Sequence, residues 1–207
     1  MTATPLPDPV ADPSAYTRAV LALVGDRDPL AVQRELVASL RAAIAGLADA
    51  DLRRPERAGK WSIAQVIQHL ADSEIVYGYR YRMAIAQDGA PLAGYDQDAW
   101  AENLHYDETD VEAALTELAA LRAANLRLLS RLTPEEWQRA GLHAERGRES
   151  VRHIAHLLAG HDLLHLRQIE RIKTALGLAA SPLPPRAPVA PLATILDELA
   201  ADREDRC

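Results

Sequence analysis

The chain has 207 residues, of which 48% are apolar, and its 30 acidic and 23 basic side chains give a net charge of −7. This length suits one domain with extensions, and it is sufficient to bury a core without disulfide bonds. The acidic balance argues against a nucleic-acid partner, because phosphate contacts need a basic surface. The sequence also lacks the run of about 18 apolar residues that a membrane-spanning helix requires.

Both ends of the chain carry features that bear on the cellular compartment. The N-terminal stretch MTATPLPDPVADP lacks the basic and apolar regions of a signal peptide. The single cysteine, Cys207, is the last residue, which excludes an intrachain disulfide. These features together predict a cytoplasmic protein.

A proline-rich stretch precedes the long amphipathic part of the sequence. Residues 1–28 are predicted to form an extended lead-in with one short helix over 14–24, which Gly25 ends. Residues 29–177 hold the helical periodicity of a four-helix bundle.

A second proline-rich stretch follows the bundle, within residues 178–207. Five prolines over 181–191 predict a semi-rigid linker. A short amphipathic helix is expected over 192–203, because apolar residues recur there at helical spacing: Leu192, Ile195, Leu196 and Leu199. This helix can cover its own bundle or that of a second subunit, and the sequence leaves both arrangements open.

The first helix of the bundle begins at a clear capping sequence. Asp28 followed by Pro29 combines an acidic cap with proline at the first helical position. A helix is therefore predicted over 29–48, with an apolar face formed by Leu30, Leu36, Val37, Leu40 and Ile44.

The second helix is predicted from a capping box and is followed by a long connection. Ser62 and Gln65 have the spacing of a capping box, and the helix is expected to continue to about Gln87. Residues 88–109 contain glycine, proline, asparagine and many aspartates. A connection of ~20 residues suits a crossover between two parallel helices better than a tight antiparallel turn.

The third helix is predicted from Thr109 to about Arg131. Thr109 and Glu112 have the spacing of a capping box. The expected apolar face consists of Leu115, Leu118, Leu121, Leu126 and Leu129.

The segment before the fourth helix is predicted to be short and irregular. A helical piece starts at Thr133, residues 141–147 form a loop, and Ser150 caps a fourth helix that Gly177 ends. No hairpin signal flanked by alternating apolar residues appears in the sequence. The predicted fold class is therefore all-α, a four-helix bundle with short terminal helices.

Two histidines fall inside the apolar stripe of the fourth helix. At about 100° per residue, His161 and His165 share a sector with Ile154, Leu157, Leu158, Gln168 and Ile172. His156 points to the opposite side. Burying an imidazole without a partner is unfavourable, so two of them on one buried face need an explanation. A divalent metal ion supplies one, because imidazoles at i and i+4 can share it.

The natural third ligand is His69 on the second helix. It lies in the same sector as Val66, Ser73 and Val76, on the flank of that helix's apolar stripe. Three histidines without a thiolate leave coordination positions for water or substrate, as in catalytic zinc sites. The sequence pattern also allows the histidines to be core residues without a metal. A His-x-x-x-His pair can arise by chance, and core histidines commonly bond a backbone carbonyl.

Two stretches of this sequence form a recognisable pair of motifs: Trp61-Ser62 with His69-Leu70-Ala71-Asp72-Ser73-Glu74, and His161-Asp162-Leu163-Leu164-His165-Leu166-Arg167-Gln168-Ile169. In this order they resemble the second and fourth helices of the DinB/YfiT-like superfamily of metal-dependent hydrolases and transferases. The resemblance covers about residues 29–176. It implies a four-helix bundle with an up-down-down-up course and a long crossover between helices two and three. It also implies one Zn or Ni ion held by His69, His161 and His165.

Three further polar residues lie near the predicted ligands. Asp72 and Glu74 are candidates for a general base or for an acid that orients a ligand, although acids at such positions are more often solvated or paired with arginine. Gln168 shares the ligand stripe and is expected either to hydrogen-bond near the site or to fill the edge of the core. No side chain is assigned a catalytic role from the sequence, and the expected reacting group is a water molecule bound to the metal.

The resemblance leaves three functions open. The first is an enzyme acting on a small molecule, either a transferase that uses a low-molecular-weight thiol or a hydrolase. The second is a stress-associated metal-binding protein without turnover, and the third is an interaction module whose histidines are core residues. The resemblance also implies a homodimer, and metal content is the observation that best separates these functions.

Overall fold

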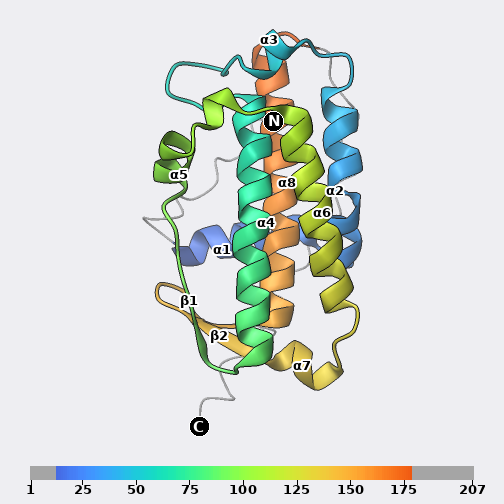
Figure 1. Ribbon diagram of the computed structural model, residues 1–207, viewed down its shortest axis with the longest axis vertical. Coiled ribbons are helices and arrows are strands. Elements are labelled where there is room, and N and C mark those ends of the chain that lie inside the picture. The colour runs from blue at the N-terminus through green and yellow to red at the C-terminus, as the bar shows by residue number, and fades with distance from the viewer. Residues whose placement is uncertain (1–12, 179–207) are drawn as a thin grey trace.

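The computed structural model describes residues 13–178, which form a helical bundle with a small sheet at one end (Figure 1). The predicted lead-in over 1–12, the linker over 181–191 and the helix over 192–203 lie outside these residues. The helices are α1 Pro13–Val24, α2 Pro29–Ile44, α3 Asp49–Leu52, α4 Ile63–Ala86, α5 Gln97–Asn103, η1 Tyr106–Glu108, α6 Val111–Leu129, α7 Pro134–Gln138 and α8 Val151–Ala175. The strands are β1 Ala90–Leu92, β2 Ala140–His143 and β3 Gly147–Ser150.

The long helices begin where their caps predict. The Asp28 side chain accepts a hydrogen bond from the Leu30 amide, and Ser62 and Gln65 form the complete capping box of α4. The Ser150 hydroxyl likewise caps α8. The predicted start of the third helix was wrong by one residue, because Asp110 rather than Thr109 is its N-cap. A side-chain cap depends only on neighbouring residues, which is why local sequence identifies it well.

Helices α2, α4, α6 and α8 form the bundle. The helix α8 packs against both α2 and α4, and α6 packs against the same two helices from the other side. Following the colours in Figure 1, α4 and α6 run in one direction and α2 and α8 run in the opposite one. The connection between α4 and α6 therefore returns along the length of the bundle, and it carries β1, α5 and η1 on the way. None of the helices in residues 13–178 is long and apolar enough to cross a bilayer.

The buried face of α6 differs from the predicted one. Leu115, Leu118 and Leu129 are buried as expected, whereas Leu121 and Leu126 are only partly buried. Arg122 and Asn125 occupy the buried face instead. Their spacing from Leu118 is helical, but a pattern search that counts only apolar residues assigns polar side chains to the solvent face.

A three-stranded sheet corrects the all-α prediction. Strand β2 pairs with β1 in parallel and with β3 in antiparallel fashion, so the segment predicted as a loop over 141–147 is part of a β-hairpin. Strands of three or four residues are too short to show the alternation by which a strand is recognised in sequence. The fold is nevertheless mostly helical.

Helix α1 packs across α8 next to the bundle. Val20 and Val24 are buried there, and Gly160 on α8 makes the close approach possible. A Cβ atom at Gly160 would overlap the Val20 carbonyl oxygen, so only glycine accommodates the α1 backbone at this point. The predicted helix over 14–24 is confirmed and is packed onto the bundle.

A buried ion cluster centred on Arg122 links all four bundle helices. The Arg122 guanidinium donates to Glu74 on α4 at 2.7 Å, to Asp162 on α8 at 2.6 and 3.1 Å, and to the Gln33 carbonyl oxygen on α2 at 2.8 Å. Asn125 donates a further hydrogen bond to Glu74 at 2.8 Å. Burial opposes the charge on Arg122, but Asp162 and Glu74 outweigh it and raise the pKa of the guanidinium.

Replacing Arg122 should be strongly destabilising. Arg122→Ala leaves two carboxylates buried without their cation, and breaking a buried pair in this way costs about 3–5 kcal/mol. Urea denaturation followed by circular dichroism measures the loss. The control is Arg41→Ala, which removes the exposed ion pair with Glu112 and should cost less than about 1 kcal/mol. Equal losses for the two variants would contradict a central role for Arg122.

Candidate metal centre

Three histidines from two helices converge in the middle of the bundle. His69 comes from α4, and His161 and His165 come from successive turns of α8. The Nε2 atom of His161 lies 3.1 Å from Nε2 of His69 and 3.1 Å from Nε2 of His165. One potential ligand atom from each histidine lies within 4.8 Å of the other two. The structure therefore brings together the three residues predicted as ligands.

Burial keeps all three imidazoles neutral. His69 is fully buried, His165 is 7% exposed and His161 is 9% exposed. Burial lowers the pKa of each ring, and the neighbouring histidines lower it further for His69 and His161. For His165 burial lowers the pKa to about 4, although Gln168 opposes that shift. A neutral imidazole has the lone pair that a metal ligand needs.

The donor set fits a divalent ion. Three neutral Nε2 atoms that face one another cannot all be satisfied by mutual hydrogen bonds, since each shared proton requires one donor and one acceptor. An ion at ~2.0–2.1 Å from each nitrogen accepts all three lone pairs, and nitrogens 3.1 Å apart are compatible with that arrangement. Three imidazoles without thiolate or carboxylate match an open site rather than a closed structural one.

Gln168 orients one of the three ligands. Its Oε1 atom lies 2.7 Å from Nδ1 of His165, one turn further along α8. Because a carbonyl oxygen only accepts, Nδ1 carries the proton and Nε2 presents its lone pair toward the other histidines. By contrast, Nδ1 of His69 and Nδ1 of His161 are buried without a hydrogen-bond partner in residues 13–178.

Residues of the crossover and of the loop before α4 complete the surroundings of His69. The Trp61 ring lies 4.9 Å from the His69 ring. Ser73 Oγ is 3.4 Å from Nε2 of His69 and 3.0 Å from the hydroxyl of Tyr95. No sequence pattern marks Tyr95 as a site residue, because only the folded crossover brings it to α4.

The two predicted acids have structural partners. The carboxylate of Glu74 is fully buried and bonds Arg122 and Asn125, so the structure does not bring it to the histidines. Asp72 accepts a hydrogen bond from the Tyr106 hydroxyl at 2.5 Å and one from Gln68 at 3.2 Å. Asp72 therefore connects α4 to η1, and Glu74 connects α4 to α6.

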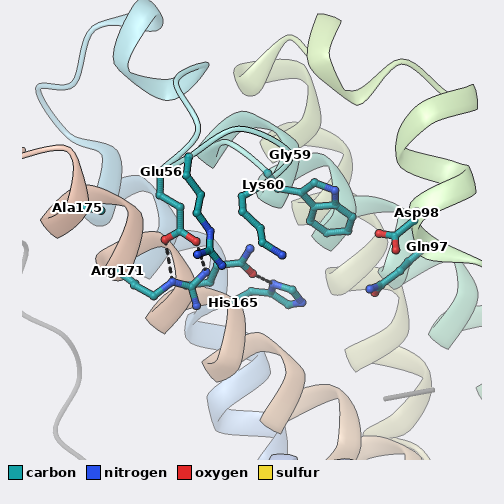
Figure 2. Close-up of a pocket in the computed structure, with 11 residues that line it drawn as sticks. Glu56, Gly59, Lys60, Gln97, Asp98, His165, Arg171 and Ala175 are labelled. Carbon is teal, nitrogen blue, oxygen red and sulfur yellow. Dashed lines mark hydrogen bonds and ion pairs between the residues drawn. The ribbon is translucent and has the colours of Figure 1, made fainter. Parts of the chain in front are cut away.

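An open pocket leads to His165. It has a volume of about 1000 Å³, and Figure 2 shows His165 on its floor beside Lys60. Trp61 lines one wall, and Gln168 lines the pocket next to His165. A small molecule can thus reach His165, one member of the histidine cluster, from solvent.

The family follows from residues 34–169, which match the model of the DinB superfamily. The chain belongs to the DinB superfamily. The matched residues include all three histidines and Gln168, together with Arg122 and its partners Glu74 and Asp162.

Individual relatives agree with this assignment. A protein of Geobacillus thermodenitrificans named "Putative metal-dependent hydrolase" is 34% identical over 110 residues, 53% of this chain and 62% of that protein. YfiT of Bacillus subtilis, which bears the same description, is 30% identical over 114 residues, 55% of this chain and 64% of YfiT. The matched regions therefore span less than two thirds of either relative.

A solved structure supports the fold. The structure of YfiT from Bacillus subtilis, described as a probable metal-dependent hydrolase with an unusual four-helix bundle topology, superposes with a TM-score of 0.69. The identity is 26%, and the superposition covers 73% of this chain and 87% of YfiT. The mostly helical architecture is thus shared with that bundle.

Removing one histidine should remove the metal. Purified protein is expected to carry about one divalent ion per chain, and His161→Ala should abolish it, because the two remaining imidazoles make a much weaker site. Elemental analysis after dialysis measures the content. His156→Ala is the matched control, since that ring bonds the Arg152 carbonyl oxygen away from the cluster. Loss of metal in the control but not in His161→Ala would refute the assignment.

Gln168 should tune the affinity without being a ligand. Gln168→Ala removes the acceptor that holds the His165 tautomer, and a lost orienting contact costs about 10–100-fold in metal affinity. Competition against a chelating dye measures the dissociation constant. An unchanged constant would show that the His165 ring is held by packing alone.

Proposed function

We propose that this chain is a metal-dependent enzyme of the DinB superfamily that acts on a small molecule, with one Zn or Ni ion held by His69, His161 and His165. The observation that carries the proposal is the convergence of three Nε2 atoms in a cluster whose His165 lines an open pocket. A metal site without access to solvent would suit a structural role, whereas this one faces a cavity large enough for a substrate. The up-down-down-up course is part of the same proposal, supported by the helix directions in Figure 1.

When bound, a divalent ion supplies Lewis acidity that polarises an oxygen or sulfur atom of a reactant. The residues of this chain prepare that chemistry. Gln168 keeps the His165 lone pair directed at the cluster, and Trp61 shields His69 from water. Ser73 and the Tyr95 hydroxyl form a hydrogen-bonded pair beside His69, so they can donate a hydrogen bond to a reactant that lies next to His69.

Hydrolysis and thiol transfer are the two versions of this proposal. The relatives described as metal-dependent hydrolases support the first version. A transferase would use the same metal to hold the thiolate of a low-molecular-weight thiol near an electrophile. The neutral donor set supports either version, because it leaves the ion with its full positive charge.

Turnover should depend on the metal and will separate the two versions. Protein loaded with Zn or Ni should cleave activated esters or amides if it is a hydrolase. It should conjugate 1-chloro-2,4-dinitrobenzene only with added thiol if it is a transferase. His161→Ala and chelated wild type should both lose the activity. Metal-loaded protein that is inactive in both assays would favour the alternative, a stress-associated metal-binding protein without turnover.

The homodimer implied by the family remains a proposal. Ile75 and Tyr79 lie one turn apart on α4 and are 44% and 52% exposed, which offers an apolar surface for association. Sedimentation velocity at micromolar concentration tests the oligomeric state directly.

A further inference from the structure

Three segments of the chain form the pocket over His165. The loop between α3 and α4 forms one wall, α5 forms the opposite one, and the last turns of α8 form the floor (Figure 2). The lining residues are Glu56, Arg57, Gly59, Lys60, Trp61, Gln97, Asp98, His165, Gln168, Arg171 and Ala175.

The charges on these walls are not balanced. Arg171 donates two hydrogen bonds to Glu56, at 2.9 and 3.2 Å, so these two charges offset each other. Arg57 and Lys60 form no ion pair within the part of the chain that the structure describes. Asp98 is the other acidic residue of the lining, which leaves an excess of one positive charge. This is notable in a chain whose net charge is −7.

The position of Lys60 is specific. Figure 2 shows its side chain extending from the loop into the pocket toward His165. The chain has two lysines, and the other, Lys173, is buried and bonds Glu170 and the Ala43 carbonyl oxygen. The chain thus places an accessible ammonium group at the entrance to its histidine cluster.

This arrangement suits a ligand with an anionic end. A guanidinium and an ammonium group are the side chains that best bind carboxylate and phosphate oxygens. Isolated exposed cations contribute little because water screens them, but cations in a concave wall focus the field along the cavity. His165 lies on the floor of this cavity, so a divalent ion held by the three histidines would add to the same field.

We propose that the pocket binds a small molecule with an anionic end, a carboxylate or a phosphate, through Arg57 and Lys60. The rest of the molecule then lies along Trp61 and reaches His165, the member of the histidine cluster that lines the pocket. The inference that the other end of this ligand reacts at the histidines rests on the proposed function. The inference about the anionic end is independent of that function, because Arg57 and Lys60 lie on the loop between α3 and α4 and contact the anion without the metal.

Calorimetric titration of the zinc-loaded full-length chain with glutarate tests the proposal. Arg57→Gln with Lys60→Gln should weaken glutarate binding by about tenfold or more, because both cations that face the anionic end are lost; tenfold corresponds to about 1.4 kcal/mol. The control double variant is Arg34→Gln with Arg131→Gln, which removes the same charge from exposed positions on other faces. Its affinity should stay within about twofold of wild type. Equal weakening in both double variants, or none in either, would overturn the proposal.

Three further arms sharpen the result. Glutaramide, the neutral analogue, should bind far more weakly than glutarate; equal binding would show that the pocket does not select charge. Titration with inorganic phosphate tests which anion the pocket accepts. Phosphate binding that Arg57→Gln with Lys60→Gln weakens would show that phosphate is accepted, and absence of phosphate binding would restrict the proposed ligand to carboxylates. Glu56→Gln removes a negative charge and loosens Arg171, so it should tighten glutarate binding, an effect that a misfolded variant would not produce.

Metal content separates this proposal from the proposed function. Every variant is assayed by elemental analysis before titration, and the titration is repeated after chelation. Anion binding that survives chelation and depends on Arg57 and Lys60 supports the pocket even if the metal-dependent activity is absent. Anion binding that needs the metal and ignores both substitutions assigns the anion to the metal and overturns the role of the loop.

Discussion

The arrangement of the histidines depends on the buried ion cluster of Arg122. Its partner Glu74 lies five residues after His69 on α4, and its partner Asp162 directly follows His161 on α8. A slip of either helix by one turn would separate the cation from a carboxylate inside the core, where an unpaired charge is very costly. The cluster therefore sets the register at which the histidines of α4 meet those of α8.

The bundle and the loops have separate tasks in this architecture. The bundle holds three neutral imidazoles in a buried setting, and a rigid, dry environment strengthens their hold on a cation. The segments between the bundle helices shape the pocket outside the cluster, with Trp61 and Lys60 from one loop and Asp98 from α5. Under the proposed function, the loops are therefore expected to select the small molecule, and the bundle is expected to select the metal.

Much of the site was accessible from local patterns. The caps at Asp28, Ser62 and Ser150 marked helix starts, and the four-residue spacing of His161 and His165 placed both on one buried face. Choosing His69 as the third member needed the family resemblance in addition to its position on a helix flank. The apolar pattern of the third helix does not indicate the buried position of Arg122, although its helical spacing from Leu118 places both on one face.

Local sequence decides to within about a residue where the long helices of this protein begin, and it decides which histidines share a helix face, because caps and helical periodicity act over about four residues. It does not decide the three-stranded sheet, in which β2 pairs with its neighbour β3 and also with β1, a segment far away in the sequence. Nor does it bring Glu74 to Arg122 or Lys60 to the rim above His165. Those contacts join residues tens of positions apart, and only the packing of the bundle, which excludes water and makes unpaired charges costly, selects them.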